Sequence, residues 1–151
     1  MSKPKLLISS CFCGLNTKYN GGNNHLPRYE EIKEKFELFL ICPEQMGGLS
    51  TPRNPSEIKG KKVFSNEGKD VTAEFQKGAD IALKIALENN IKIALLKESS
   101  PSCGSNLKYD GTFTGKKVPG TGVAAALLIK HGIKIYNENQ INQLLENCDG
   151  E

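Results

Sequence analysis

Four short, continuous apolar runs constrain the fold of this chain more than any other feature. They occupy residues 5–9, 38–41, 91–96 and 133–136. Each run is continuous instead of alternating with polar residues, which is typical of a strand that is buried on both faces. Strands of this kind occur in parallel sheets whose two faces are covered by helices. The pattern therefore predicts a short, mainly parallel sheet.

Helical patterns separate these runs along the chain. Residues 26–36, 72–89 and 121–131 each place apolar side chains at helical spacing, and a capping-box pattern begins a last helix within 137–148. Strands that alternate with helices predict a three-layer, Rossmann-like α/β fold with right-handed crossovers. The length of 151 residues and the lack of a linker predict a single domain that spans residues 1–151.

One segment, residues 60–71, does not fit the alternation of strands and helices. It contains two short β-type stretches, residues 62–65 and 69–71, on either side of Asn66-Glu67-Gly68. Short strands that flank a turn sequence of this composition are typical of a hairpin. We therefore expect a small hairpin insertion here.

Charge and hydropathy argue against several classes of partner. The formal net charge is +3 and the basic residues are scattered, so neither a nucleic-acid partner nor an electrostatic membrane surface is expected. No apolar run approaches the ~20 residues that cross a bilayer. The apolar stretch near the N-terminus is shorter than the ~7–15 residues of a signal-peptide core. We therefore expect a cytoplasmic protein.

The cysteines pose the main functional question. There are five, namely Cys11, Cys13, Cys42, Cys103 and Cys148. An odd number of cysteines in a reducing compartment argues against a disulfide framework. The sequence has no Cys-x-x-Cys pair, so zinc-ribbon and thioredoxin-type explanations also fail.

Three of the five cysteines occupy equivalent positions relative to the predicted strands. Cys11 follows the first strand, Cys42 ends the second, and Cys103 comes a short loop after the third. Ligands of open parallel sheets bind outside the carboxyl ends of the strands, where loops distant in sequence converge. The spacing therefore predicts that these three thiols meet at one site. Cys148 lies on the apolar stripe of the last helix and is expected to pack there, while the role of Cys13 stays open.

Three convergent thiolates can bind a metal. The residues alone do not decide between zinc, an iron–sulfur cluster and no metal. Zinc normally takes a fourth protein ligand, or a water at an open catalytic position. An iron–sulfur cluster usually has four cysteine ligands, so with three one iron is free to bind a substrate atom. The remaining alternative is that all three are free cysteines packed as small hydrophobic side chains.

The loops beside these cysteines carry further candidates. Glu44 follows Cys42 closely and can act as a general acid or base. Arg53, between two prolines in a long irregular stretch, offers a donor fork for a planar or anionic partner. The loops that hold Tyr19 and Asp110 are aromatic and glycine-rich and can line a pocket. Ser100 lies in a hydroxyl-rich segment before Cys103.

Alternatives to these assignments follow from the same residue types. Ser99 and Ser102 are expected to serve turn formation and helix capping. Gly120-Thr121-Gly122 precedes a predicted helix, where backbone N–H groups can bind phosphate, so a nucleotide- or phosphate-binding protein is an alternative function. A zinc-binding module without turnover is another.

A series of motifs in the same order resembles the thiouracil desulfidase family over nearly the whole chain. The motifs are Ser10-Cys11, Tyr19-Asn20-Gly21, Cys42-Pro43-Glu44, Gly47-Gly48-Leu49, Pro52-Arg53, Val71-Thr72, Phe75, Gly78-Ala79, Lys97-Glu98, Ser100-Pro101-Ser102-Cys103-Gly104, Tyr109-Asp110-Gly111-Thr112-Phe113 and Gly120-Thr121-Gly122-Val123.

The resemblance implies an oxygen-sensitive [4Fe–4S] cluster held by Cys11, Cys42 and Cys103. It also implies that the iron without a cysteine ligand takes the sulfur of a small thiolated base such as 2-thiouracil, and that water replaces this sulfur. Glu44 and Ser100 match positions expected to handle protons or to activate water. Tyr19, Arg53 and Asp110 are the matching candidates for substrate binding. Neither the physiological substrate nor the oligomeric state follows from the resemblance.

One departure from the family pattern affects substrate preference. Many members have Arg-Tyr-Asp-Gly where this chain has Lys18-Tyr19-Asn20-Gly21. Lysine does not reproduce the planar fork of arginine, and asparagine removes a negative charge. The three cysteines are unaffected by this departure.

Overall fold

A four-stranded parallel sheet lies at the centre of the computed structural model, which describes residues 3–51 and 53–147. Its strands follow the order β2 (Glu37–Ile41), β1 (Lys5–Ser9), β5 (Ile93–Leu95) and β8 (Lys134–Tyr136). All three neighbouring pairs are parallel. The four apolar runs therefore form the strands that were predicted from them, with bounds that differ by at most two residues.

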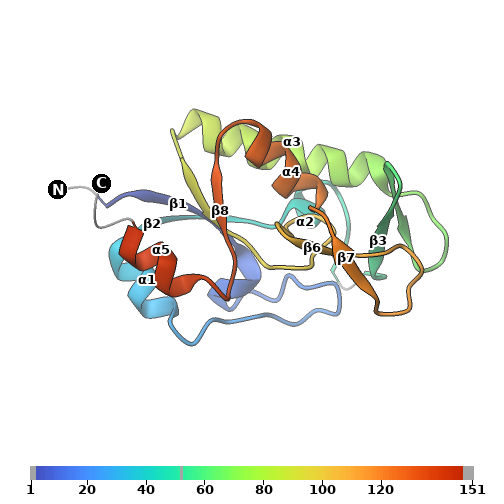
Figure 1. Ribbon diagram of the computed structural model, residues 1–151, viewed down its shortest axis with the longest axis horizontal. Helices are drawn as coiled ribbons and strands as arrows, with labels where there is room; N and C mark the ends of the chain where they lie inside the picture. Colours follow the sequence, from blue (N-terminus) through green and yellow to red (C-terminus); the bar gives the residue numbers. More distant parts are fainter. Residues whose placement is uncertain (1–2, 52, 148–151) are drawn as a thin grey trace.

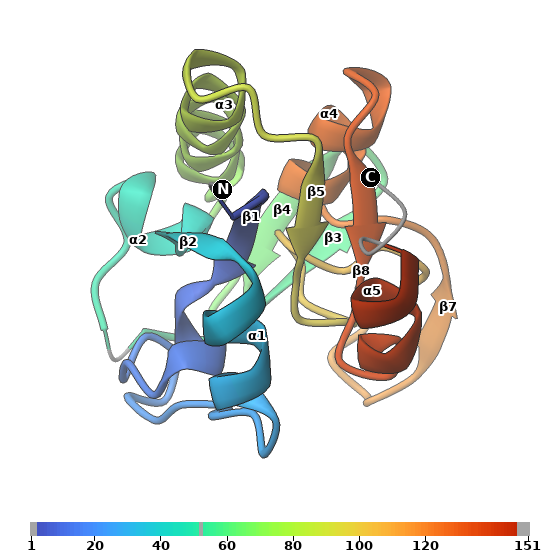
Figure 2. The same ribbon diagram turned by 90° about the vertical axis from the view of Figure 1, so that its left-hand side faces the viewer.

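Helices cover both faces of this sheet. Figure 2 shows α3 (Thr72–Glu88) and α4 (Val123–Lys130) on one side, and α1 (Tyr29–Lys35) and α5 (Ile141–Asn147) on the other. This arrangement confirms the predicted three-layer α/β fold. Cys148, which was expected to pack on the last helix, lies outside the described residues.

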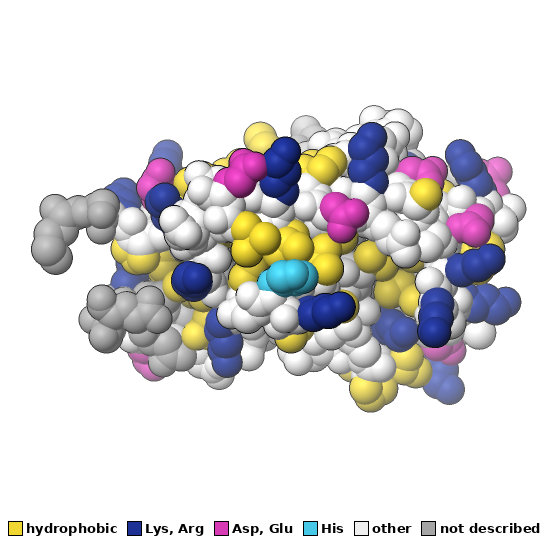
Figure 3. All heavy atoms as spheres, turned by 90° about the horizontal axis from the view of Figure 1, so that it is seen from above, with side chains coloured by type: hydrophobic (Ala, Val, Ile, Leu, Met, Phe, Trp, Pro, Cys, Tyr) yellow, Lys and Arg dark blue, Asp and Glu magenta, His cyan; other side chains and the backbone are white. Residues whose placement is uncertain are grey.

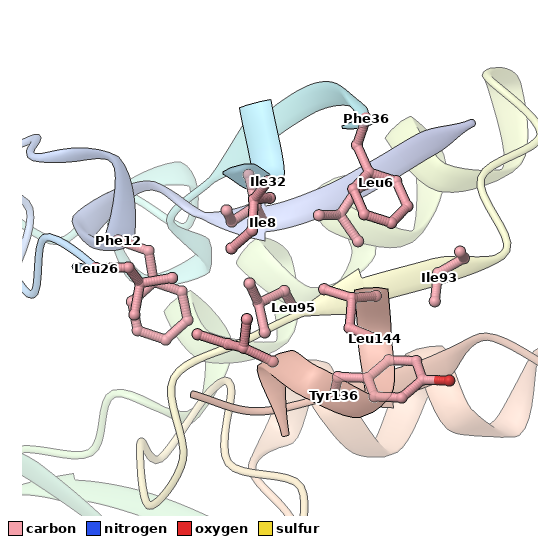
Figure 4. Packing of buried hydrophobic residues seen from close by; sticks show 11 residues of the cluster. Leu6, Ile8, Phe12, Leu26, Ile32, Phe36, Ile93, Leu95, Tyr136 and Leu144 are labelled. Atoms are coloured by element: carbon pink, nitrogen blue, oxygen red, sulfur yellow. The ribbon is translucent and has the colours of Figure 1, made fainter. Parts of the chain in front are cut away.

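The core consists of two clusters, one on each face of the sheet. Leu6 and Ile8 of β1 point toward α1 and α5 and pack with residues such as Leu144 (Figure 4). Leu7, between them in sequence, points to the other face and packs with Ala82 and Leu128. All of these side chains are fully buried. Successive strand residues point to opposite faces, so a sheet that is covered on both sides needs apolar residues at every position.

The hairpin insertion is present, but its pairing differs from the prediction. Strand β4 (Lys62–Ser65) pairs antiparallel with β3 (Ser56–Lys59), which precedes it. The turn between them contains Gly60 at φ 65°, a backbone conformation that glycine adopts without steric cost. Residues 69–71, the predicted partner, keep a single bridge between Phe64 and Asp70. A two-residue turn at Gly60 therefore sets the register.

Two further elements were not predicted. A second hairpin joins β6 (Leu107–Tyr109) and β7 (Lys117–Pro119), in the region expected to be a glycine-rich loop. A short helix, α2 (Pro43–Met46), follows β2 in the stretch expected to be irregular. Figure 1 shows the two hairpins at the end of the molecule away from the termini.

The strand order places a topological switch between β1 and β5. The chain passes from β1 to β2 on one side, and from β5 to β8 on the other. Ligands of open α/β sheets bind at such a switch, beyond the carboxyl ends of the strands. The loops after β1, β2 and β5 therefore surround the expected binding site.

The surface has mixed charge on the face that α3 and α4 present. Figure 3 shows both dark-blue (Lys, Arg) and magenta (Asp, Glu) side chains scattered over this face.

Among residues 3–51 and 53–147, no helix has both the length and the apolar character needed to cross a membrane.

Candidate active site

A cavity of about 470 Å³ lies beyond the carboxyl ends of β1, β2 and β5. The loops that follow these three strands all contribute to its lining, together with residues of β3, β6 and β7. Cys11, Cys42 and Cys103 are among the lining residues. The structure therefore brings the three strand-end cysteines to one cavity, as their positions relative to the strands predicted.

Each of these cysteines is fixed by a different local structure. Cys11 belongs to the 3-10 helix η1 (Ser10–Cys13), which directly continues β1. Cys42 is the N-cap residue of α2, whose first residue is Pro43. Cys103 lies in the turn after β5, where the Gly104 N–H donates to the Ser100 carbonyl at 3.0 Å.

Close packing of α2 against α3 fixes the position of Cys42. A Cβ atom added to Gly78 of α3 would lie 1.7 Å from the Pro43 carbonyl oxygen, and one added to Gly47 would lie 1.8 Å from the Glu74 carbonyl oxygen. Only glycine allows backbones to approach this closely. The two glycines therefore hold the start of α2, and with it Cys42, against α3.

Burial controls the protonation of the thiols. Desolvation raises the pKa of Cys103 to about 12, against hydrogen bonds from Ser102 and Ser9 that lower it. Desolvation also raises the pKa of Cys11, although the Asn24 amide donates to its sulfur at 3.4 Å. The Cys42 thiol faces the Thr17 carbonyl oxygen at 3.8 Å. Thiolates are the form that binds metals, so a metal centre that binds Cys11 and Cys103 must displace their protons.

Glu44 lies beside the thiols in a nearly buried ion pair. Its Oε1 accepts from Arg53 Nε at 3.0 Å, and the two side chains are 13% and 8% exposed. The Arg53 guanidinium also donates to the Thr17 carbonyl at 3.0 Å and to the Thr51 hydroxyl at 2.8 Å. Arg53 therefore holds Glu44 in place in this structure, and its predicted contact with a substrate stays a prediction.

A pair of serine hydroxyls connects Glu44 to the turn before Cys103. Ser102 Oγ donates to Glu44 Oε2 at 3.1 Å and lies 3.1 Å from Ser100 Oγ. Ser100 Oγ accepts the backbone N–H groups of Ser102 and Cys103 at 3.2 and 3.1 Å. Ser102 was expected to serve turn formation and helix capping, so sequence reasoning missed its contact with Glu44. The alternation of two serines directly before a cysteine was the available signal.

Comparison with known proteins agrees with this geometry. The model of the 2-thiouracil desulfurase family matches residues 6–140. The chain belongs to this family. The resemblance predicted from the sequence motifs is therefore confirmed.

Two relatives of this family member match it over almost their whole length. Uncharacterized protein YbbK of Bacillus subtilis (strain 168) is 40% identical, and the match covers 93% of this chain and 99% of that protein. A solved structure of the [4Fe-4S]-dependent thiouracil desulfidase TudS is 39% identical, with a TM-score of 0.94. That match covers 99% of this chain and 100% of the TudS chain.

The thiols fit an iron–sulfur cluster of the type named for TudS. Three cysteines from three separate loops line a cavity of about 470 Å³, which is far larger than one ion. Within the described residues, no three His, Cys, Asp or Glu side chains form a group that could hold a single metal ion. Thiolates are the ligands that iron–sulfur clusters take, and three of them leave one iron without a protein ligand.

The loop that carries Ser100, Ser102 and Cys103 is organised by Glu98, another residue that sequence reasoning missed. Glu98 Oε1 accepts the backbone N–H groups of Ser99, Ser105, Asn106 and Leu107 at 3.0–3.1 Å. Its Oε2 accepts the side-chain amides of Asn106 and Asn137 at 3.1 and 2.8 Å. Burial opposes the charged form, but these hydrogen bonds outweigh it and lower the pKa of Glu98 to about 2. The available sequence signals were an acidic residue shortly after a buried strand and the Lys97-Glu98 motif.

The other predicted substrate contacts divide into two groups. Tyr19 and Lys18 line the cavity, and Tyr19 is 45% exposed. Asp110 does not line it, because the Asp110 carboxylate is turned to the backbone N–H and hydroxyl of Thr112, at 2.9 and 2.5 Å. The predicted substrate contact of Asp110 stays a prediction, and its neighbour Tyr109 lines the cavity.

The structure also places the two remaining features of the sequence. Cys13 lies outside the cavity lining, and its thiol interacts with Tyr29. The start of α4, the alternative phosphate site, is occupied by protein groups. The N–H groups of Gly122, Val123 and Ala125 donate to carbonyl oxygens of residues 101–104 at 2.7–2.9 Å. These donors are therefore used to hold the Cys103 loop and do not face a phosphate site.

Proposed function

We propose that this protein removes sulfur from a small thiolated nucleobase of the 2-thiouracil type, with a [4Fe–4S] cluster held by Cys11, Cys42 and Cys103. The observation that carries the proposal is the convergence of these three thiols on one cavity, beside Glu44 and two serine hydroxyls. Family membership and the match to TudS support the same reaction.

The overall reaction is a hydrolysis without net oxidation or reduction. The thiocarbonyl compound and water yield the carbonyl compound and hydrogen sulfide, so 2-thiouracil gives uracil. When bound, the cluster supplies a thiophilic iron without a cysteine ligand, a Lewis acid that polarises the C–S bond and accepts sulfur. The cavity volume of about 470 Å³ admits a pyrimidine base beside such a group.

Glu44 is the proposed acceptor of the proton that the attacking water loses. The ion pair with Arg53 holds the Glu44 carboxylate in place beside the cysteines. Ser102 donates to the second oxygen of Glu44, and Ser100 lies next in this chain of hydroxyls. Ser100 thereby orients a substrate or water that enters the cavity, and Ser102 links it to the base.

The substrate and compartment follow from the same arrangement. A free base is the proposed substrate, because the basic residues are scattered along the sequence and the three cysteines line a cavity of about 470 Å³. A nucleic-acid partner is therefore not proposed.

An oxygen-sensitive cluster and thiol ligands require a reducing compartment, which supports a cytoplasmic location. The prediction of a single domain over residues 1–151 stays a prediction.

Anaerobic reconstitution tests this proposal. Protein treated with iron and sulfide without oxygen is expected to turn brown, to bind about four irons per chain, and to release sulfide from 2-thiouracil. Protein loaded with zinc is expected to release none. Iron-free protein after reconstitution, or tight stoichiometric zinc that survives air with no turnover in any form, would favour the metal-binding module instead.

A further inference from the structure

A buried carboxylate at the hairpin side of the cavity has no role in the reaction described above. Glu57 of β3 lines the cavity and is 9% exposed. Its Oε1 accepts the backbone N–H groups of Gly111 and Phe113, at 3.0 and 3.2 Å. Both donors belong to the loop between β6 and β7, so two hairpins distant in sequence fix the orientation of this carboxylate.

The loop is shaped to make this contact. Gly111 has φ +94°, and a Cβ atom added there would lie 3.0 Å from the Ile58 carbonyl oxygen of β3. Phe113 also has a positive φ, 59°, which is costly for a residue with a side chain. The backbone thus has a positive φ at two positions, of which the one at Phe113 is costly, and directs two N–H groups at the same carboxylate oxygen.

The second carboxylate oxygen of Glu57 is left for another partner. No hydrogen bond joins Oε2 to a described residue, and no side-chain oxygen or nitrogen sealed from solvent in the described part of the chain lacks a partner. Oε2 therefore keeps access to open space, and the cavity is the space that Glu57 lines. A carboxylate oxygen accepts hydrogen bonds and donates none when ionised, so the matching ligand group is an N–H or O–H donor.

We propose that Glu57 is a specificity residue that accepts a hydrogen bond from a ring N–H of the thiolated base. This inference rests on the proposed function and names the substrate class more narrowly: a cyclic thioamide with a free N–H beside its thiocarbonyl carbon. 2-Thiouracil carries such groups at N1 and N3. Bases alkylated at the nitrogen that faces Glu57 are rejected, because the buried acceptor is then left without a partner.

Glu57→Gln separates recognition from a merely structural role. In this variant the side-chain amide oxygen still accepts the N–H groups of Gly111 and Phe113, while the amide nitrogen replaces the acceptor at the cavity by a donor. The loop is therefore expected to stay in place and the thermal stability to change little. Glu67→Gln, in the exposed turn after β4, is the matched control and is expected to change nothing.

The test uses cluster-loaded protein and two readouts. The first is KM and kcat for sulfide release from 2-thiouracil and its 1-methyl and 3-methyl derivatives. The second is calorimetric binding of uracil, 1-methyluracil and 3-methyluracil, which needs no turnover. Wild-type protein is expected to bind one methyl derivative about tenfold to hundredfold more weakly than the parent base, as the loss of a hydrogen bond to a charged group predicts. Glu57→Gln is expected to weaken parent binding by a similar factor and to abolish this selectivity.

These measurements distinguish a failure of recognition by Glu57 from a failure of the proposed desulfuration. If wild-type protein binds no uracil, or shows no selectivity between the parent and either methyl derivative, Glu57 does not read an N–H group. The same holds if Glu57→Gln lowers affinity for all three bases by one common factor. Selective uracil binding without sulfide release would overturn the proposed reaction and leave the recognition by Glu57 in place.

Discussion

The carboxylate of Glu98 is expected to be the largest single electrostatic contribution to the stability of the active-site loop. It accepts four backbone N–H groups and two side-chain amides, and it is 8% exposed. In Glu98→Gln the amide oxygen can still accept the backbone groups. The amide nitrogen, however, faces the donors of Asn106 and Asn137 and cannot bind them.

The magnitude follows from the pKa of Glu98, which is lowered from 4.5 to about 2. Each unit of pKa difference corresponds to about 1.4 kcal/mol, so the ionised form stabilises the folded protein by about 3 kcal/mol near neutral pH. For a domain of this size, such a loss lowers the melting temperature by roughly 6–12 °C. Glu88→Gln, which removes an exposed partner of Lys84, is the control and is expected to cost less than about 0.5 kcal/mol.

The pH dependence has a definite sign. Because the folded-state pKa of Glu98 is lowered, its contribution is fully present above the unfolded-state value of 4.5 and is lost as the pH falls toward 2. Urea unfolding of wild type and Glu98→Gln should therefore show a constant difference in free energy of unfolding above about pH 5, and a shrinking one below. A difference under about 1 kcal/mol at pH 7, or one that persists unchanged to pH 3, would refute this reasoning.

Two further variants test the placement of the site residues. Gly78→Ala puts a Cβ atom 1.7 Å from the Pro43 carbonyl oxygen. It is expected to lower the free energy of unfolding in urea by about 3 kcal/mol and to lower iron loading. The control is Lys77→Ala, an exposed position on the same helix, which should lower the free energy of unfolding by less than about 0.5 kcal/mol. Normal iron loading in Gly78→Ala would show that cluster binding does not depend on the packing of α2 against α3. Ser102→Ala removes the hydroxyl donor to Glu44 and is expected to lower kcat by at least about tenfold with an unchanged cluster spectrum. Ser99→Ala is its control, and equal effects of the two serine changes would argue against the link to Glu44.

The positions of the three cysteines could be predicted because they depend on strand ends alone. In a parallel sheet the carboxyl ends of all strands lie at the same edge, so Cys11, Cys42 and Cys103 had to approach one another once the strands were recognised. The layers of the fold were predictable for a similar reason. A continuous apolar run such as residues 5–9 requires cover on both faces, and the helical patterns supply it.

The contacts between loops could not be predicted in the same way. Ser102, Glu98 and Glu57 acquire their partners from loops or hairpins whose approach depends on turn geometry, such as the two-residue turn at Gly60. Asp110 is a candidate by residue type, and its Oδ1 accepts from the N–H and the hydroxyl of Thr112, a local contact that its residue type does not predict. Local sequence patterns predict elements, whereas the assignment of each polar side chain needs the three-dimensional arrangement.

The most direct test of the central claim compares two cysteine variants after anaerobic reconstitution. Cys103 is buried in the cavity lining and is a proposed ligand, whereas Cys13 lies outside that lining. The measurement is iron content together with sulfide release from 2-thiouracil. We expect Cys13→Ser to retain about four irons per chain and full activity, and Cys103→Ser to lose both. Equal iron and equal activity in the two variants would contradict it.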